Sequence, residues 1–146
     1  MNASPLDTLE QALSRFVAVL DGESAALAVA DTDALARALG DKETLSGEVS
    51  AAWTAGMAWL RAQSPGSARQ PLEIPAALTP RWQSIVALAR RAEALNQSNG
   101  QQIEALLERT RGALGVLQAA ARPVDLYGAD GHLLDASRPG NTIDSV

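Results

Sequence analysis

The sequence predicts an all-α protein, an elongated antiparallel bundle or coiled coil of three long helices followed by a flexible C-terminal tail. Three observations indicate this class. Apolar residues make up 47% of the 146 residues but aromatic residues only 3%, and the apolar content is mainly Ala and Leu, which favour helix packing. Apolar residues recur at three- and four-residue intervals. Proline and glycine gather in residues 64–79 and after residue 121, where helices are expected to stop.

The first helix is expected over residues 5–30. Ser4 is a suitable N-cap, Pro5 fits the first helical position, and Asp7 lies in the positive first turn. One apolar stripe follows the helical period: Leu6, Leu9, Leu13, Phe16 and Leu20. This stripe predicts the face that packs against the other helices.

The second helix is expected over residues 33–63, with either Asp31 or Thr32 as its N-cap. Two register choices are open in its stripe, which consists of Leu35, Leu39 or Ala38, Lys42, Leu45, Val49, Trp53 or Ala52, Gly56 and Leu60. Residues 64–79 then contain three prolines and a glycine, and we expect them to form a Pro-rich loop.

The third helix is expected over residues 80–121, with Thr79 as N-cap and Pro80 at the first helical position. Its stripe has a 3.5-residue period, typical of coiled-coil packing, and contains Trp82, Ile85, Ala89, Ala92, Asn96, Asn99, Ile103, Leu106, Thr110, Ala113 and Leu117. Asn96 and Asn99 would form a polar layer that fixes the register. The unbroken period predicts one continuous helix, and a turn at residues 98–100 is the alternative.

These elements divide the chain into a helical bundle, residues 1–121, and a Gly- and Pro-containing tail, residues 122–146. At about 1.5 Å per residue, the third helix is roughly 63 Å long and the second roughly 46 Å. The end of the third helix, near 111–121, should therefore extend past its partners and carry Leu114, Val116 and Leu117. An uncovered apolar end favours a partner that supplies the missing helix. The alternative is that the tail folds back and covers it.

Composition argues against several classes of function. The net charge is −5, without a strong basic segment, so nucleic-acid binding has no electrostatic basis. There is no cysteine, and the single histidine, His132, falls in the expected tail. The acidic residues do not have the spacing of metal ligands. We therefore expect no enzyme activity and no cofactor or metal. The start of the chain lacks the pattern of a secretory signal and no apolar run is long enough to span a membrane, which predicts a cytoplasmic protein without membrane insertion.

The most specific local pattern runs from the third helix into the tail. It consists of Asn96-Gln-Ser-Asn-Gly100, an apolar stripe containing Leu114, and Leu126-Tyr-Gly-Ala-Asp-Gly131. This pattern resembles the FlgN family of flagellar type III export chaperones. The resemblance implies a chaperone that binds the C-terminal helical region of the hook–filament junction proteins, of the FlgK and FlgL type, and delivers them to the export gate. A self-associating structural coiled-coil scaffold is the alternative function, and other helical flagellar proteins share the composition but lack these segments.

The resemblance also implies roles for individual residues. It places substrate-protein binding in the C-terminal part, on Ile103, Leu106, Leu107, Leu114 and Leu117. The alternative is that these side chains belong to the bundle core, which we expect for Ile103 and Leu106. The resemblance links Tyr127 to docking on the large export-gate subunit, whereas Tyr127 could instead pin the tail onto the bundle. A chaperone should be a monomer or a weak homo-oligomer on its own, whereas a scaffold should form a stable oligomer.

Overall fold

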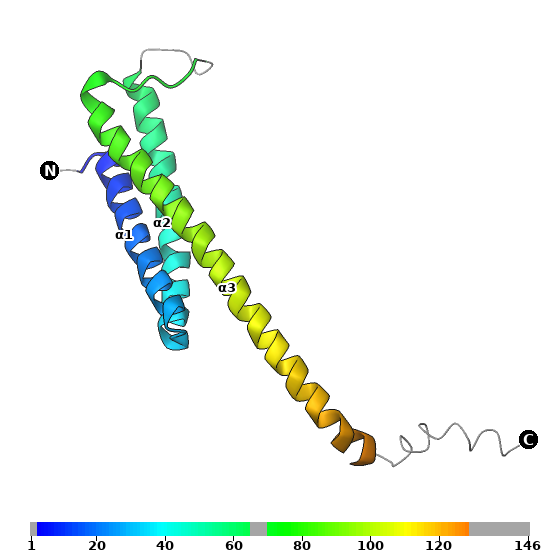
Figure 1. The fold of residues 1–146 in the computed structure, drawn as a ribbon. Helices are drawn as coiled ribbons and strands as arrows, with labels where there is room; N and C mark the ends of the chain where they lie inside the picture. The colour runs from blue at the N-terminus through cyan, green and yellow to red at the C-terminus, as the bar shows by residue number, and fades with distance from the viewer. Residues whose placement is uncertain (1–2, 65–69, 129–146) are drawn as a thin grey trace, which may run out of the picture. The chain divides into compact units, whose positions relative to one another are not determined.

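The computed structural model is all-helical in the part of the chain that it describes, which is residues 3–64 and 70–128, with side chains described as far as residue 121. The elements are α1 (Pro5–Ala28), α2 (Thr32–Gln63), the short 3₁₀ helix η1 (Ala76–Leu78) and α3 (Thr79–Gly128). The chain divides into an N-terminal unit, Met1–Ile103, and a C-terminal unit, Glu104–Val146. The N-terminal unit is an antiparallel bundle of α1, α2 and the first part of α3 (Figure 1), which confirms the predicted fold class.

Helix α1 begins with a capping box. The amide of Asp7 donates to Ser4 Oγ at 3.2 Å, and the amide of Ser4 donates to Asp7 Oδ2 at 2.9 Å. These two bonds satisfy donors that the first turn of a helix otherwise leaves free. Ser4 is thus the N-cap that the sequence predicted. Asp31, rather than Thr32, caps α2, because its Oδ1 accepts from the amide of Ala34 at 3.0 Å.

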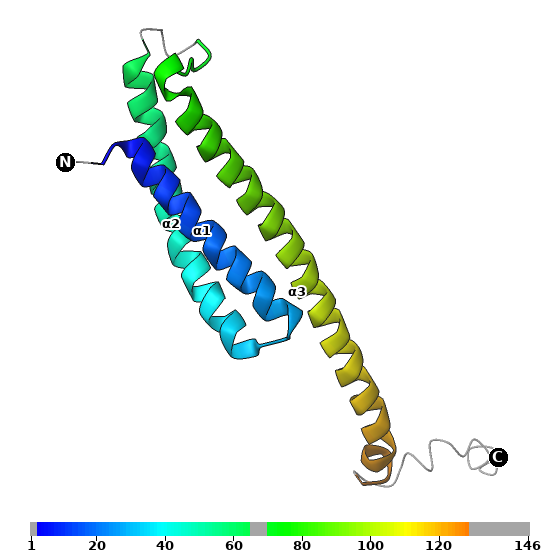
Figure 2. The same cartoon turned by 60° about the vertical axis from the view of Figure 1, so that its left-hand side comes forward.

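The turn between α1 and α2 is short, and it has an alanine at the left-handed position that glycine usually occupies in such turns. The amide of Asp31 donates to the Ala26 carbonyl at 3.0 Å and that of Ala30 to Leu27 at 3.3 Å, the two bonds of a Schellman motif. Ala30 has a φ of 53°. This turn reverses the chain, so that α2 runs antiparallel to α1 (Figure 2).

Helices α1 and α2 pack closely because small residues lie between them. Gly56 of α2 is buried, and a Cβ there would lie 3.3 Å from Leu9 Cδ2. Of the register choices open in α2, the structure buries Ala38 and Ala52, whereas Leu39 and Trp53 are 50% and 42% exposed. The main core cluster contains Leu6, Leu9, Ala12, Leu13, Ala52, Leu60 and Ile85. The apolar stripe of α1 is therefore the centre of the bundle.

The first part of α3 packs on α1 with matched charges. Arg81 pairs with Asp7 and Glu10, Ser84 Oγ donates to Glu10 Oε1 at 2.7 Å, and Arg91 pairs with Asp21 at 3.2 Å. Exposed ion pairs of this kind contribute little stability, but opposite charges along two facing helix edges favour one register. Three acidic residues of α1 thus lie against two arginines of α3.

A buried polar cluster of Glu23, Lys42 and Asn99 connects all three helices. Glu23 and Asn99 are fully buried. Asn99 Nδ2 donates to Glu23 Oε1 and to the Leu20 carbonyl, both at 2.9 Å, and Lys42 Nζ lies 3.4 Å from Glu23 Oε1. This explains why Lys42 occupies a position in the apolar stripe of α2. The predicted polar layer is half realised, because Asn96 is exposed.

Helix α3 is continuous through Asn99 and Gly100, as the unbroken period predicted, and it continues to Gly128 rather than ending at Ala121. Pro123 lacks an amide donor for the carbonyl of Ala119. Ala119 is exposed, so water can satisfy that carbonyl and the helix can continue past the proline. The expected tail beyond that residue, including His132, lies outside the described residues.

Candidate functional site

The most apolar exposed surface of the described chain lies on α3 beyond Ile103. Four large apolar side chains there are about half exposed or more, and three of them lie on one side of the helix: Leu107 at 47%, Leu114 at 52% and Leu117 at 65%. Together with Leu106 and Thr110 these three leucines form what we call the leucine face. At about 100° of rotation per residue, its five members fall within roughly 100° of the helix circumference. An exposed apolar face of this kind indicates a binding surface.

The other side of the same helix segment is mainly polar or small. Glu104, Glu108 and Gly112 lie there by helical geometry, with Gly115. Val116 is an exception, since it is 69% exposed and lies well away from the leucine face. The described side chains from Leu107 to Ala121 are all exposed. The segment is therefore an amphipathic helix whose apolar side has no cover among the described residues.

The sequence-predicted binding residues differ in exposure. Ile103, the last residue of the N-terminal unit, and Leu106 are partly buried, and neither is among the residues of the two core clusters. Leu107, Leu114 and Leu117 are exposed on one helix face. Tyr127 lies in the last turn of α3, and its side chain is outside the described part of the chain. The candidate site is therefore defined by the leucines alone.

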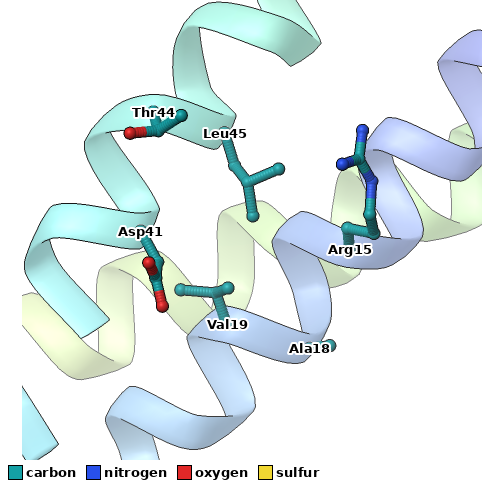
Figure 3. Close-up of a pocket in the computed structure, with 6 residues that line it drawn as sticks. All are labelled: Arg15, Ala18, Val19, Asp41, Thr44 and Leu45. Carbon is teal, nitrogen blue, oxygen red and sulfur yellow. The ribbon is translucent and has the colours of Figure 1, made fainter. Parts of the chain in front are cut away.

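The N-terminal unit has shallow open grooves between helices. One, of about 360 Å³, lies between α1 and α2, with Arg15, Ala18 and Val19 on one side and Asp41, Thr44 and Leu45 on the other (Figure 3). Arg15 also pairs with Glu48 at 2.6 Å. Another, of about 400 Å³, is lined by residues of all three helices, including Phe16, Val49 and Trp53. None of the predicted site residues lines these grooves.

The polar side chains of the described residues do not form a metal-binding cluster. Within residues 3–64 and 70–128, no three His, Cys, Asp or Glu side chains are grouped so that they could hold a metal ion. The buried Glu23 already accepts hydrogen bonds from Asn99 and Lys42. Among the helices described, none combines the length and the apolar character needed to cross a membrane. The leucine face, an exposed apolar helix surface, is thus the principal candidate site among the described residues.

A comparison with known protein families identifies the family of the chain. The family model described as FlgN protein matches residues 4–134, which include the bundle, the leucine face and Tyr127. The chain belongs to the FlgN family. The match covers the part from which the sequence resemblance was drawn, and it extends over α1 and α2 as well.

Two curated FlgN relatives are similar over part of their length. The proteins named "Flagella synthesis protein FlgN" from Salmonella typhimurium strain LT2 and from Salmonella typhi are each 41% identical to the chain over 63 residues. That alignment covers 43% of this chain and 44% of each relative. The aligned part is thus less than half of either relative. No solved structure matches the chain.

Proposed function

We propose that this FlgN-family protein is a cytoplasmic flagellar type III export chaperone that binds the C-terminal helical region of hook–filament junction proteins. The observation that carries the proposal is the exposed leucine face of α3. Membership of the FlgN family and the names of the Salmonella relatives, which refer to flagella synthesis, support the flagellar setting.

The proposed mechanism is capture of an amphipathic helix. The client lays its apolar side along Leu107, Leu114 and Leu117, and Leu106 forms the edge of the contact. Helix-in-groove recognition of this kind uses anchors at three- and four-residue spacing, and Leu107, Thr110, Leu114 and Leu117 have that spacing. Covering apolar surface contributes about 25 cal/mol per Å². Because its helical end is covered, the bound client stays unassembled until export.

Delivery to the large export-gate subunit is proposed for the end of α3, around Tyr127. Tyrosine is enriched among residues that dominate protein interfaces. Tyr127 is ten residues beyond Leu117, so the chain can bind the client and the gate through different residues. Client capture and gate docking are therefore assigned to separate parts of one helix.

Titration calorimetry tests the client assignment. The full chain is titrated with the C-terminal helical segment of each junction protein from the same genome. We expect one-to-one binding, with a negative heat-capacity change because apolar surface is buried. Absence of binding to either segment would contradict the chaperone function.

The structural scaffold is the competing function, since an exposed apolar helix face can also pair with a second copy of itself. Sedimentation analysis distinguishes the two. A chaperone should be a monomer or weakly associated alone and form a heterocomplex with its client. A stable oligomer that does not dissociate when client is added would favour the scaffold.

A further inference from the structure

The helix that carries the leucine face is stabilised mainly by its own local propensity. All described side chains from Leu107 to Ala121 are exposed, so this part of α3 lacks the tertiary packing that supplies most helix stability in proteins. Helix content here therefore depends strongly on which residues occupy the exposed positions.

Two of these positions are glycines that the helix does not require sterically. Gly112 and Gly115 are within α3, and a Cβ added at either meets no heavy atom within 4 Å. By contrast, Gly56 of α2 would place a Cβ 3.3 Å from Leu9. Glycine lowers helix propensity more than any residue except proline. At positions 112 and 115 it thus weakens the helix without making room for a described neighbour.

The two glycines also lie away from the leucine face. By helical geometry Gly112 is about 170° and Gly115 about 130° from the centre of that face. A client helix on the leucine face would not need the space that a missing Cβ leaves there. The glycines therefore act on the stability of the helix and not on its contact surface.

We propose that Gly112 and Gly115 limit the affinity for the client by lowering the helix content of the free C-terminal part of α3. The proposal rests on the proposed chaperone function and concerns its regulation. Binding must then order the part of the helix that is frayed in the free protein, which lowers the apparent affinity. A carrier that must hand over its cargo benefits from this limit, because the complex forms through the leucine face yet dissociates readily.

The test uses three pairs of substitutions in the full chain. Gly112→Ala with Gly115→Ala strengthens the helix on the side away from the leucine face. Ala105→Gly with Ala119→Gly weakens it at positions that are also exposed and off that face. Gly40→Ala with Gly47→Ala is the control, because these exposed glycines of α2 likewise leave open space for 4 Å around an added Cβ.

Far-UV circular dichroism and calorimetric titration with the client segment are measured for each pair. The alanine pair in α3 should raise helix content and tighten binding by up to about fivefold for each glycine replaced. The Ala105 and Ala119 pair should lower both quantities. The control pair should leave the affinity unchanged.

Two results would overturn the inference. Higher helix content with unchanged affinity would show that ordering of α3 does not limit binding. Weaker binding by the alanine pair would show that a partner contacts the glycine side. If the unmodified chain does not bind the client, the proposed function fails instead, and an unchanged helix content in the alanine pair would separately refute the role of the glycines.

Discussion

At the residue scale, the amide of Asn99 joins α3 to α1 through two hydrogen bonds in a place that water does not reach. Its Nδ2 donates hydrogen bonds to the Leu20 carbonyl and to the Glu23 carboxylate, whereas its Oδ1 has no hydrogen-bond partner among the described residues. A half-satisfied polar group costs stability, but the directional bonds of a buried amide favour one helix register over others. Asn99 therefore favours one register of α3 against α1, and its unsatisfied oxygen lowers the stability of the bundle.

Replacing Asn99 tests this role. We expect Asn99→Ala to lower the free energy of unfolding by about 1–3 kcal/mol, because a buried carboxylate loses a donor. Urea unfolding followed by tryptophan fluorescence measures the change. Asn96→Ala is the control, since Asn96 is exposed and should change stability by about 0.5 kcal/mol or less. Equal effects of the two substitutions would contradict the assignment.

The leucine face gives a second prediction at this scale. Leu114→Ser with Leu117→Ser should weaken client binding roughly 100-fold, because each leucine contributes about 1.5 kcal/mol or more when it becomes buried. The fold should change little, since both side chains are exposed in the free protein. Calorimetry and thermal unfolding measure the two properties.

The matched control for the leucines is Val116→Ser with Ala119→Ser, two exposed positions off the leucine face. This pair should weaken client binding by no more than about threefold, because serine in place of alanine lowers helix propensity by only about 0.5 kcal/mol. Loss of binding in both pairs would show that helix content alone, and not the leucine face, determines affinity. Global unfolding of the leucine pair would show that Leu114 and Leu117 are core residues.

The sequence predicted part of this buried polar cluster. The 3.5-residue period placed both Asn96 and Asn99 in the seam, and only the packed structure buries one and exposes the other. The burial of Glu23 was missed because Glu23 is charged, although it lies three residues beyond Leu20 and continues the period of the α1 stripe. A signal was available: Lys42 and Asn99 both occupied apolar positions, and buried polar groups require partners.

At the element scale, the α1–α2 turn depends on one residue in an unfavourable conformation. Ala30 has a positive φ, and a residue with a Cβ in that region costs about 1 kcal/mol or more relative to glycine. The two backbone bonds of the turn hold it there. The turn is therefore a place where stability can be gained.

We expect Ala30→Gly to raise the free energy of unfolding by up to about 1 kcal/mol, measured by urea denaturation. The control is Ala28→Gly two residues earlier. Ala28 is also exposed but is the last residue of α1, so the same substitution there should destabilise, by up to about 1 kcal/mol. A destabilising Ala30→Gly would contradict the Schellman geometry of this turn.

The elements themselves were largely predictable, since caps, prolines and apolar periods mark the helices. The sequence could not choose between Ala38 and Leu39 or between Ala52 and Trp53 in α2, because adjacent positions fit a helical stripe almost equally well. Because α1 approaches α2 closely at Gly56, the small residues Ala38 and Ala52 are buried and the larger Leu39 and Trp53 are exposed. The end of α3 was placed too early because Pro123 usually interrupts a helix interior.

At the scale of the whole molecule, tryptophan fluorescence reports on the N-terminal unit, whereas circular dichroism reports on the helices of both units. All three tryptophans, Trp53, Trp59 and Trp82, belong to the N-terminal unit, whereas Leu106, Leu107, Leu114 and Leu117 belong to the C-terminal unit. Tryptophan fluorescence therefore follows unfolding of the bundle alone. Changes in helix content that leave fluorescence unaltered can be attributed to the C-terminal part of α3.

The two proposed partner contacts give a prediction at this scale. Tyr127→Ala should leave client affinity unchanged and weaken binding to the large export-gate subunit, because the tyrosine lies beyond the leucine face. Calorimetry against the client and a pull-down against the isolated gate subunit measure the two affinities. Equal losses in both would refute the division between client binding and gate docking.

The central claim is that the client binds the leucine face of α3, and hydrogen–deuterium exchange of the full chain with and without the client segment tests it most directly. We predict slower exchange of the backbone amides of Leu106 to Ala121 in the complex, with little change in α1 and α2. Slower exchange confined to the α1–α2 groove around Val19 and Leu45, with residues 106–121 unchanged, would contradict it.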